Sequence, residues 1–203
     1  VVGYVQSGKT ANFTSLIAKA VDAGYKLIII LAGIHNVLRK QTQIRLDQEL
    51  TGMDDLNLAK SGKIFIEEPS DIKRWIRLTN AGPFDEGEFN YTSKDPFNSL
   101  AKRKNPIIAV IKKNVTVLDS VITYIEESDD RAKESIPLLL IDDEADQASV
   151  DSNANSKNTD PTATNQRIRI LLELFQRKAY VGYTATPFAN IFIDPDSKDL
   201  IEK

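Results

Sequence analysis

The sequence contains no cysteine and only one histidine, His35. Without cysteine the chain can form neither disulfide bonds nor thiolate metal sites, and one histidine cannot build a histidine-rich metal site. No apolar run approaches the length of about 20 residues that a membrane-spanning helix needs, and no signal peptide is visible. The net charge is −3, so no overall positive field indicates a nucleic-acid partner. We therefore expect a cytoplasmic protein without a membrane partner, in which any nucleic-acid site is local.

What the chain does contain is the pattern of an α/β domain. Nearly continuous apolar runs, typical of strands buried on both faces, alternate with amphipathic helical patterns. The expected strands cover residues 25–33, 63–68, 106–114, 136–147 and 179–187, and the expected helices cover 11–24, 36–50, 115–128 and 166–178. This alternation predicts a mostly parallel β-sheet with helices on both faces, in which ligands bind at the carboxyl ends of the strands.

The length of 203 residues suits a single domain, 1–203, with two irregular stretches. Residues 79–105 are rich in Gly, Pro, Asn and Asp, which indicates an insertion that leaves the core. Residues 149–165 are polar, and we expect them to form a mobile loop. Because the chain opens almost directly on its first motif, we expect it to be a fragment of a larger protein.

That first motif, "GYVQSGKT" at residues 3–10, has the spacing of a phosphate-binding loop. Its glycines allow a tight turn whose backbone N–H groups point at one anion. Lys9 would place a positive charge at the β- and γ-phosphates, and the hydroxyl of Thr10 would bind Mg²⁺. A glycine turn between two core elements is the alternative. The predicted nucleotide-binding residues are Gly3, Gln6, Ser7, Gly8, Lys9 and Thr10.

A second motif, "LLLIDDEAD" at residues 138–146, brings acidic residues to the end of an apolar strand. Carboxylates in such a place are costly to bury, and a phosphate-bound Mg²⁺ would explain them. Asp143 could hold the ion while Glu144 orients and activates the attacking water. Asp142 is one residue out of that register and could compete for the role. A solvated acidic loop is the structural alternative.

Three motifs together resemble those of a known family. "GYVQSGKT", "IDDEADQ" and "GYTATP" are similar to motifs I, II and III of superfamily-two helicases. The resemblance is closer to the bacterial Z-one domain, described as an endonuclease domain of helicase-like proteins. "GYVQSGKTANF", "LAGIHNVLRKQTQIRL", "VIKKN", "LLLIDDEADQASV" and "YVGYTATPFANIFID" resemble its blocks, in the same order. The family is linked to restriction-type DNA systems, often encoded beside DNA methyltransferases and other ATPases.

The resemblance implies a RecA-like P-loop domain, the first of two such lobes in a DNA-dependent ATPase that uses ATP and Mg²⁺. It assigns Lys9 and Thr10 to the phosphate loop, Asp143 to the metal and Glu144 to catalysis. The implied partners are DNA, a second RecA-like lobe and further domains of the same polypeptide, and methyltransferase or ATPase components of a restriction or defence system. Endonuclease activity rests on the family's description alone, because no metal-nuclease constellation is visible in the sequence.

The third motif, matched by Thr184, Ala185 and Thr186, couples hydrolysis to movement in helicases. The hydroxyls of Thr184 and Thr186 could form hydrogen bonds with Asp146 or Glu144 across the site.

DNA contacts are expected in two segments that follow strands. His35, Asn36, Arg39 and Lys40 come after the strand at 25–33, where helicases place a segment that contacts the DNA backbone. Lys112 and Asn114 follow another strand that ends at the same edge. Clusters of this size are usually solvated helix faces. The alternative function is therefore a nucleotide-gated protein-interaction switch without DNA translocation.

Overall fold

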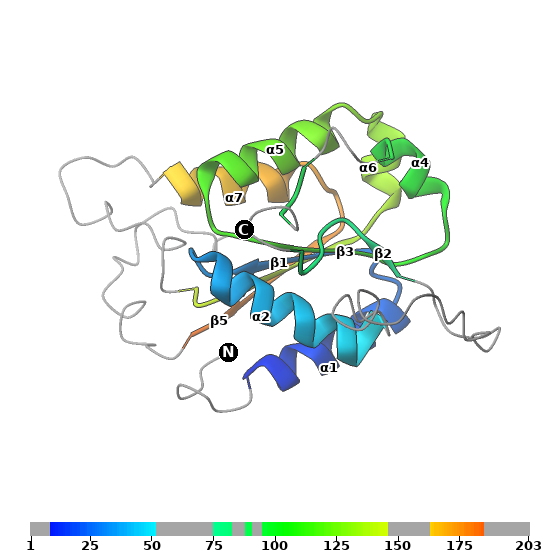
Figure 1. Ribbon diagram of the computed structural model, residues 1–203. Helices are drawn as coiled ribbons and strands as arrows, with labels where there is room; N and C mark the ends of the chain where they lie inside the picture. Colours follow the sequence, from blue (N-terminus) through cyan, green and yellow to red (C-terminus); the bar gives the residue numbers. More distant parts are fainter. Residues whose placement is uncertain (1–8, 52–74, 83–87, 91–94, 146–162, 185–203) are drawn as a thin grey trace, which may run out of the picture.

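Five parallel strands form the centre of the computed structural model (Figure 1), which describes residues 9–51, 75–82, 88–90, 95–145 and 163–184. The order across the sheet is β2-β3-β1-β4-β5. The strands are β1 Leu27–Ala32, β2 Ile76–Arg77, β3 Ile107–Ile111, β4 Leu138–Asp143 and β5 Lys178–Tyr183. The helices are α1 Lys9–Asp22, α2 Asn36–Leu46, α4 Phe97–Lys102, α5 Val115–Glu126, α6 Asp130–Ser135 and α7 Ala163–Glu173. The expected α/β class with a parallel sheet is confirmed.

Both faces of the sheet are buried, because the central strands are apolar at nearly every position. Successive side chains point to opposite faces, so each central strand contributes side chains to two separate hydrophobic clusters. On β4, Leu138 and Leu140 pack into the cluster that holds α5 and α7, whereas Leu139 and Ile141 pack into the cluster that holds α1. Figure 1 shows α1 and α2 on one face and α5 and α7 on the other.

The helices described after two neighbouring central strands lie on opposite faces of the sheet. β1 is followed by α2, on the face of α1, whereas the next helix described after β4 is α7, on the opposite face. In open α/β sheets, a change of face between the helices of neighbouring strands marks a crevice outside the carboxyl ends of those strands. The fold therefore places a crevice between the end of β1 and the end of β4.

Several boundaries differ from those expected. The helix expected over 36–50 ends at Leu46 and continues as a π-helical turn, Asp47–Thr51, in which Thr51 Oγ1 donates to the Asp47 carbonyl. Within 149–165, residues 163–165 already belong to α7, while 149–162 lie outside the described residues, as does the expected strand 63–68. The edge strand β2 was not predicted, because two residues carry no periodicity.

A buried polar network attaches β2 to α2. The Asp47 carboxylate accepts hydrogen bonds from Gln43 Nε2 at 3.0 Å and from Arg77 Nη1 at 3.0 Å. Thr79 Oγ1 donates to Gln43 Oε1 at 2.7 Å and accepts from the Val110 amide of β3 at 2.8 Å. Because each of these groups depends on the next, removing one member disturbs its neighbours as well.

We predict that Asp47→Ala lowers the free energy of unfolding by about 3 kcal/mol, because Arg77 and Gln43 lose their buried acceptor. Glu49→Ala is the control. It removes an exposed ion pair with Arg45 and should cost less than about 1 kcal/mol. Urea unfolding of both variants measures the difference, and equal losses would show that the network contributes no more than a surface charge.

Candidate functional site

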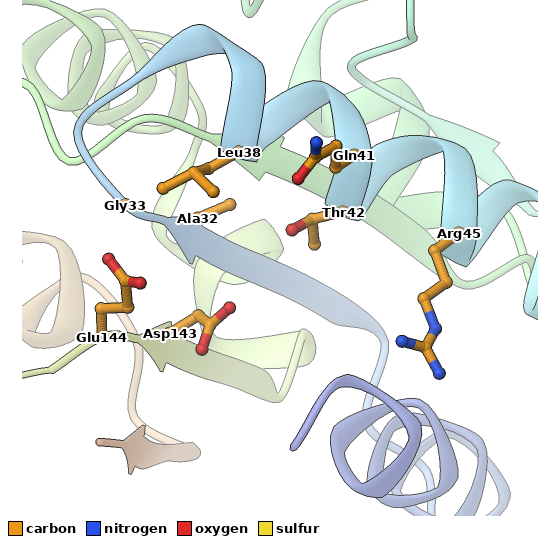
Figure 2. A pocket seen from close by; sticks show the side chains of 8 residues that line it. All are labelled: Ala32, Gly33, Leu38, Gln41, Thr42, Arg45, Asp143 and Glu144. Carbon is orange, nitrogen blue, oxygen red and sulfur yellow. The ribbon is translucent and has the colours of Figure 1, made fainter. Parts of the chain in front are cut away.

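A cleft of about 220 Å³ lies at the carboxyl edge of the sheet, between β1, β4 and α2. Figure 2 shows the side chains around it. It is lined by Ala32, Gly33, Leu38, Gln41, Thr42, Arg45, Asp143 and Glu144. The cleft lies where the fold places a crevice, outside the carboxyl ends of β1 and β4, and two of the predicted acidic residues line it.

The pleat of β4 separates the two neighbouring aspartates. Asp143 lines the cleft, on the face of Leu139 and Ile141. Asp142 lies on the opposite face and its side chain is fully buried. There Oδ2 accepts a hydrogen bond from the Tyr180 hydroxyl at 2.8 Å, and Oδ1 lies 2.7 Å from Lys113 Nζ. Asp142 therefore does not compete with Asp143 for a ligand in the cleft, because protein groups already hold it elsewhere.

Glu144 follows with a left-handed backbone, at φ 60°. This conformation costs a residue other than glycine about 1 kcal/mol, so the surrounding structure has to hold it there. Its Oε2 is buried and has no hydrogen-bond partner among the described residues. In Figure 2 the carboxylate points towards the end of β1, where Gly33 lies. Gly33 has a left-handed backbone at φ 65°, and a Cβ atom there would lie 3.1 Å from Leu38 Cδ1, so both the conformation and the space favour glycine.

The first turn of α1 contacts β5 beside Asp143. Tyr183 of β5 is the register partner of Asp143. Its hydroxyl donates to Asn12 Oδ1 of α1 at 2.8 Å, and its ring meets the ring of Phe13 edge-on at 5.6 Å. Burial raises the pKa of Tyr183, and the nearby charge of Asp143 raises it further. α1 begins at Lys9, two residues before the expected start at residue 11, so the helix includes the lysine and threonine of "GKT".

Other predicted site residues are only partly described. Thr184 is buried directly after β5, at the same edge of the sheet. Lys9 and Thr10 are the first two residues of α1. The remaining predicted positions lie outside the described residues: Gly3, Gln6, Ser7, Gly8, Asp146, Ala185 and Thr186.

The expected DNA-contacting residues do not form one exposed surface. Arg39 is a correction, because its side chain is fully buried. Its Nε lies 3.6 Å from Glu88 Oε2, and its Nη1 donates to the Asn80 carbonyl at 3.1 Å. Lys112 Nζ lies 3.4 Å from the same Glu88 oxygen, with its side chain 18% exposed. An inward-pointing arginine on a helix is indistinguishable, in the sequence, from one that faces solvent.

The four other expected DNA contacts have different surroundings, and one of them, Lys40 of α2, is half-buried. Asn114 caps α5, where its Oδ1 accepts from the Thr116 amide at 2.9 Å. His35 is exposed and precedes α2, and Asn36 is the half-buried first residue of that helix.

Sequence reasoning missed Lys113, although it named both neighbours of that residue. Alternation along β3 would have found it. Ile107, Ala109 and Ile111 all face the cluster of α5 and α7, so residue 113 is expected to continue on that face. Asp142 occupies the same face of β4, which explains why the lysine and the aspartate meet.

No helix among the described residues has the length and apolar character to cross a membrane. The same part of the chain holds no group of three or more His, Asp or Glu residues placed to share a metal ion. Comparison with protein-family models, with curated proteins and with solved structures gave no match.

Proposed function

We propose that this chain is the ATP-binding and ATP-hydrolysing lobe of a DNA-dependent, helicase-like motor in a bacterial restriction or defence system, similar to the Z-one domain. One observation carries the proposal. The acids Asp143 and Glu144 line a cleft at the carboxyl edge of the sheet, and the first turn of α1, which begins at Lys9, contacts Tyr183, the register partner of Asp143. The start of α1 and the acidic end of β4 therefore lie close together, which supports a nucleotide shared between them.

The residues present fit ATP with Mg²⁺. A helix N-terminus favours an anion, and the sequence puts the glycine loop directly before α1. The buried Glu144 Oε2 lacks a hydrogen-bond partner among the described residues, so it is available to accept a hydrogen bond from a group bound in the cleft. Thr10 and Asp143 would hold the ion, which when bound offsets negative charge on the phosphates.

In hydrolysis, Glu144 would act as the general base. Its carboxylate accepts a hydrogen bond from the attacking water and takes up the proton as the water oxygen bonds to the γ-phosphorus and the β–γ bridging bond breaks. Asp143, one residue earlier on the strand, lies on the face of the sheet that packs against α1 and would hold the Mg²⁺ that binds the phosphates. The adjacent acids thus have separate tasks because they point in different directions.

For the nucleotide we predict that Lys9→Ala abolishes measurable binding of ATP with Mg²⁺, because the phosphates lose their nearest cation. Lys19→Ala is the matched control, since Lys19 is exposed in the last turn of the same helix. Calorimetric titration of both variants gives the comparison. Unchanged ATP affinity in Lys9→Ala would remove the phosphate-loop assignment.

We predict that substitutions of Glu144 and Asp143 in the complete protein impair different steps, hydrolysis in one case and nucleotide binding in the other. Glu144→Gln keeps the shape of the side chain and removes its basicity, so ATP should bind normally while turnover falls by about 10²- to 10⁴-fold. Asp143→Asn should instead weaken Mg²⁺-dependent binding, because the ion loses a charged ligand. Single-turnover hydrolysis and nucleotide titration separate the two. Identical behaviour of both variants would mean that the acidic turn is only structural.

For the motor we predict that DNA stimulates ATP hydrolysis by the complete protein. The exposed His35 and the partly exposed Lys112 lie near this edge of the sheet, on segments that follow β1 and β3. Steady-state turnover with and without DNA is the measurement. ATP binding without any effect of DNA on turnover would favour the alternative, a nucleotide-gated protein-interaction switch.

A further inference from the structure

Lys113 is a buried cation that contacts the residues on both sides of Asp143. Its side chain is fully buried, and its Nζ lies 2.7 Å from Asp142 Oδ1. The same Nζ donates a hydrogen bond to the backbone carbonyl of Glu144. The mechanism proposed above gives Lys113 no task, and the lysine lies on the face of the sheet opposite to the cleft.

Stability alone is a poor explanation for this arrangement. Burying a lysine and an aspartate removes both from water, and an apolar pair of similar volume is often as stable or more so. The Tyr180 hydroxyl also donates a hydrogen bond to Asp142, so two polar groups contact one buried carboxylate. Lys113 also contacts the Glu144 carbonyl, and this second contact fixes a geometry.

The geometry it fixes is the left-handed turn at Glu144. Lys113 Nζ binds the carbonyl of that residue, and the amide of the next residue, Ala145, donates to the Tyr183 carbonyl at 2.8 Å. The Lys113 amide in turn donates to the Gly33 carbonyl at 2.8 Å, which ties the end of β3 to the end of β1. Groups at the ends of β1, β3 and β5 therefore hold a backbone conformation that Glu144 does not prefer on its own.

We infer that Lys113 is a positioning residue for Glu144: it holds the turn that directs the Glu144 carboxylate into the cleft. The inference rests on the proposed ATP hydrolysis, in which Glu144 is the base. The Lys113 side chain is fully buried on the face of the sheet opposite to the cleft, so it would not contact the nucleotide. It acts through the peptide group of Glu144, so its loss should disturb the direction of the carboxylate more than the binding of ATP.

Three variants of the complete protein test this role. Lys113→Met keeps the length of the side chain and removes the charge. Tyr180→Phe, the control, removes the other hydrogen bond to Asp142 and leaves Glu144 untouched. The double variant Lys113→Met, Asp142→Leu removes both buried charges, so it should regain stability while the Glu144 carbonyl still lacks its donor.

The expected result is a split between binding and turnover. In Lys113→Met, kcat should fall by roughly 10²-fold, the size of effect that follows from an ångström-scale misplacement, while the affinity for ATP stays within about twofold. Tyr180→Phe should keep kcat within about twofold of the parent protein. The double variant should unfold at the parental urea concentration and still have the low kcat.

A normal kcat in Lys113→Met would overturn the inference. So would a double variant in which kcat returns together with stability, because Lys113 would then matter only for folding. If Lys113→Met does not fold, the double variant carries the test alone, since a low kcat in a stable protein supports positioning.

A second readout separates this inference from the proposed function. If the parent protein does not hydrolyse ATP, the proposed function fails, yet hydrogen exchange at the Ala145 amide still reports on the turn. Faster exchange in Lys113→Met than in Tyr180→Phe shows that Lys113 holds the turn. Equal exchange rates in the two variants show that it does not.

Discussion

The pleat of β4 is the constraint on which the candidate site depends. Successive side chains of a strand point to opposite faces, so Asp142 and Asp143 cannot share a ligand although they are adjacent. One turns towards Tyr180 and Lys113, and the other turns towards the cleft. A slip of one residue in the pairing of β4 would exchange these positions. The parallel register with β1, in which Ala32 faces Asp143, is what prevents the slip.

Buried polar groups outside the sheet also fix the positions of its neighbouring elements. Asp47 and its partners attach the edge strand β2 to α2, and the Arg39 side chain binds the Asn80 carbonyl beyond the end of β2. The two sets of contacts lie along one helix, α2, which also lines the cleft. The position of α2 over the crevice therefore depends on hydrogen bonds as well as on apolar packing.

Part of this architecture was readable from the sequence, for a physical reason in each case. The apolar run that precedes Asp143 and Glu144 predicted a buried strand that ends in acids, because the hydrophobic pattern of a central strand is strong and local. The position of Arg39 was not readable, since its burial depends on Glu88, a residue distant in the sequence. The conformation of Glu144 was equally hidden, because a left-handed backbone is normally signalled by glycine or asparagine.

Some of the site could have been found and was not. Lys113 follows the alternation of β3, and extending that alternation two residues past the strand would have placed it beside Asp142. Lysine after a strand is usually assigned to the surface, because a buried ammonium is costly without a partner. The partner was present on β4, which is separated from β3 by β1, but strand order cannot be deduced from one strand alone.

Glu88 gives the edge of the sheet an internal counter-ion. Its Oε2 lies 3.4 Å from Lys112 Nζ and 3.6 Å from Arg39 Nε, so one carboxylate serves two cations. An external anion that approaches Lys112 meets a charge that the protein has already partly compensated. A polyanion bound there would compete with the carboxylate, so its contact with that lysine would release fewer salt ions than a contact with an isolated lysine. Its affinity would then depend less steeply on ionic strength than the number of lysines and arginines at this edge suggests.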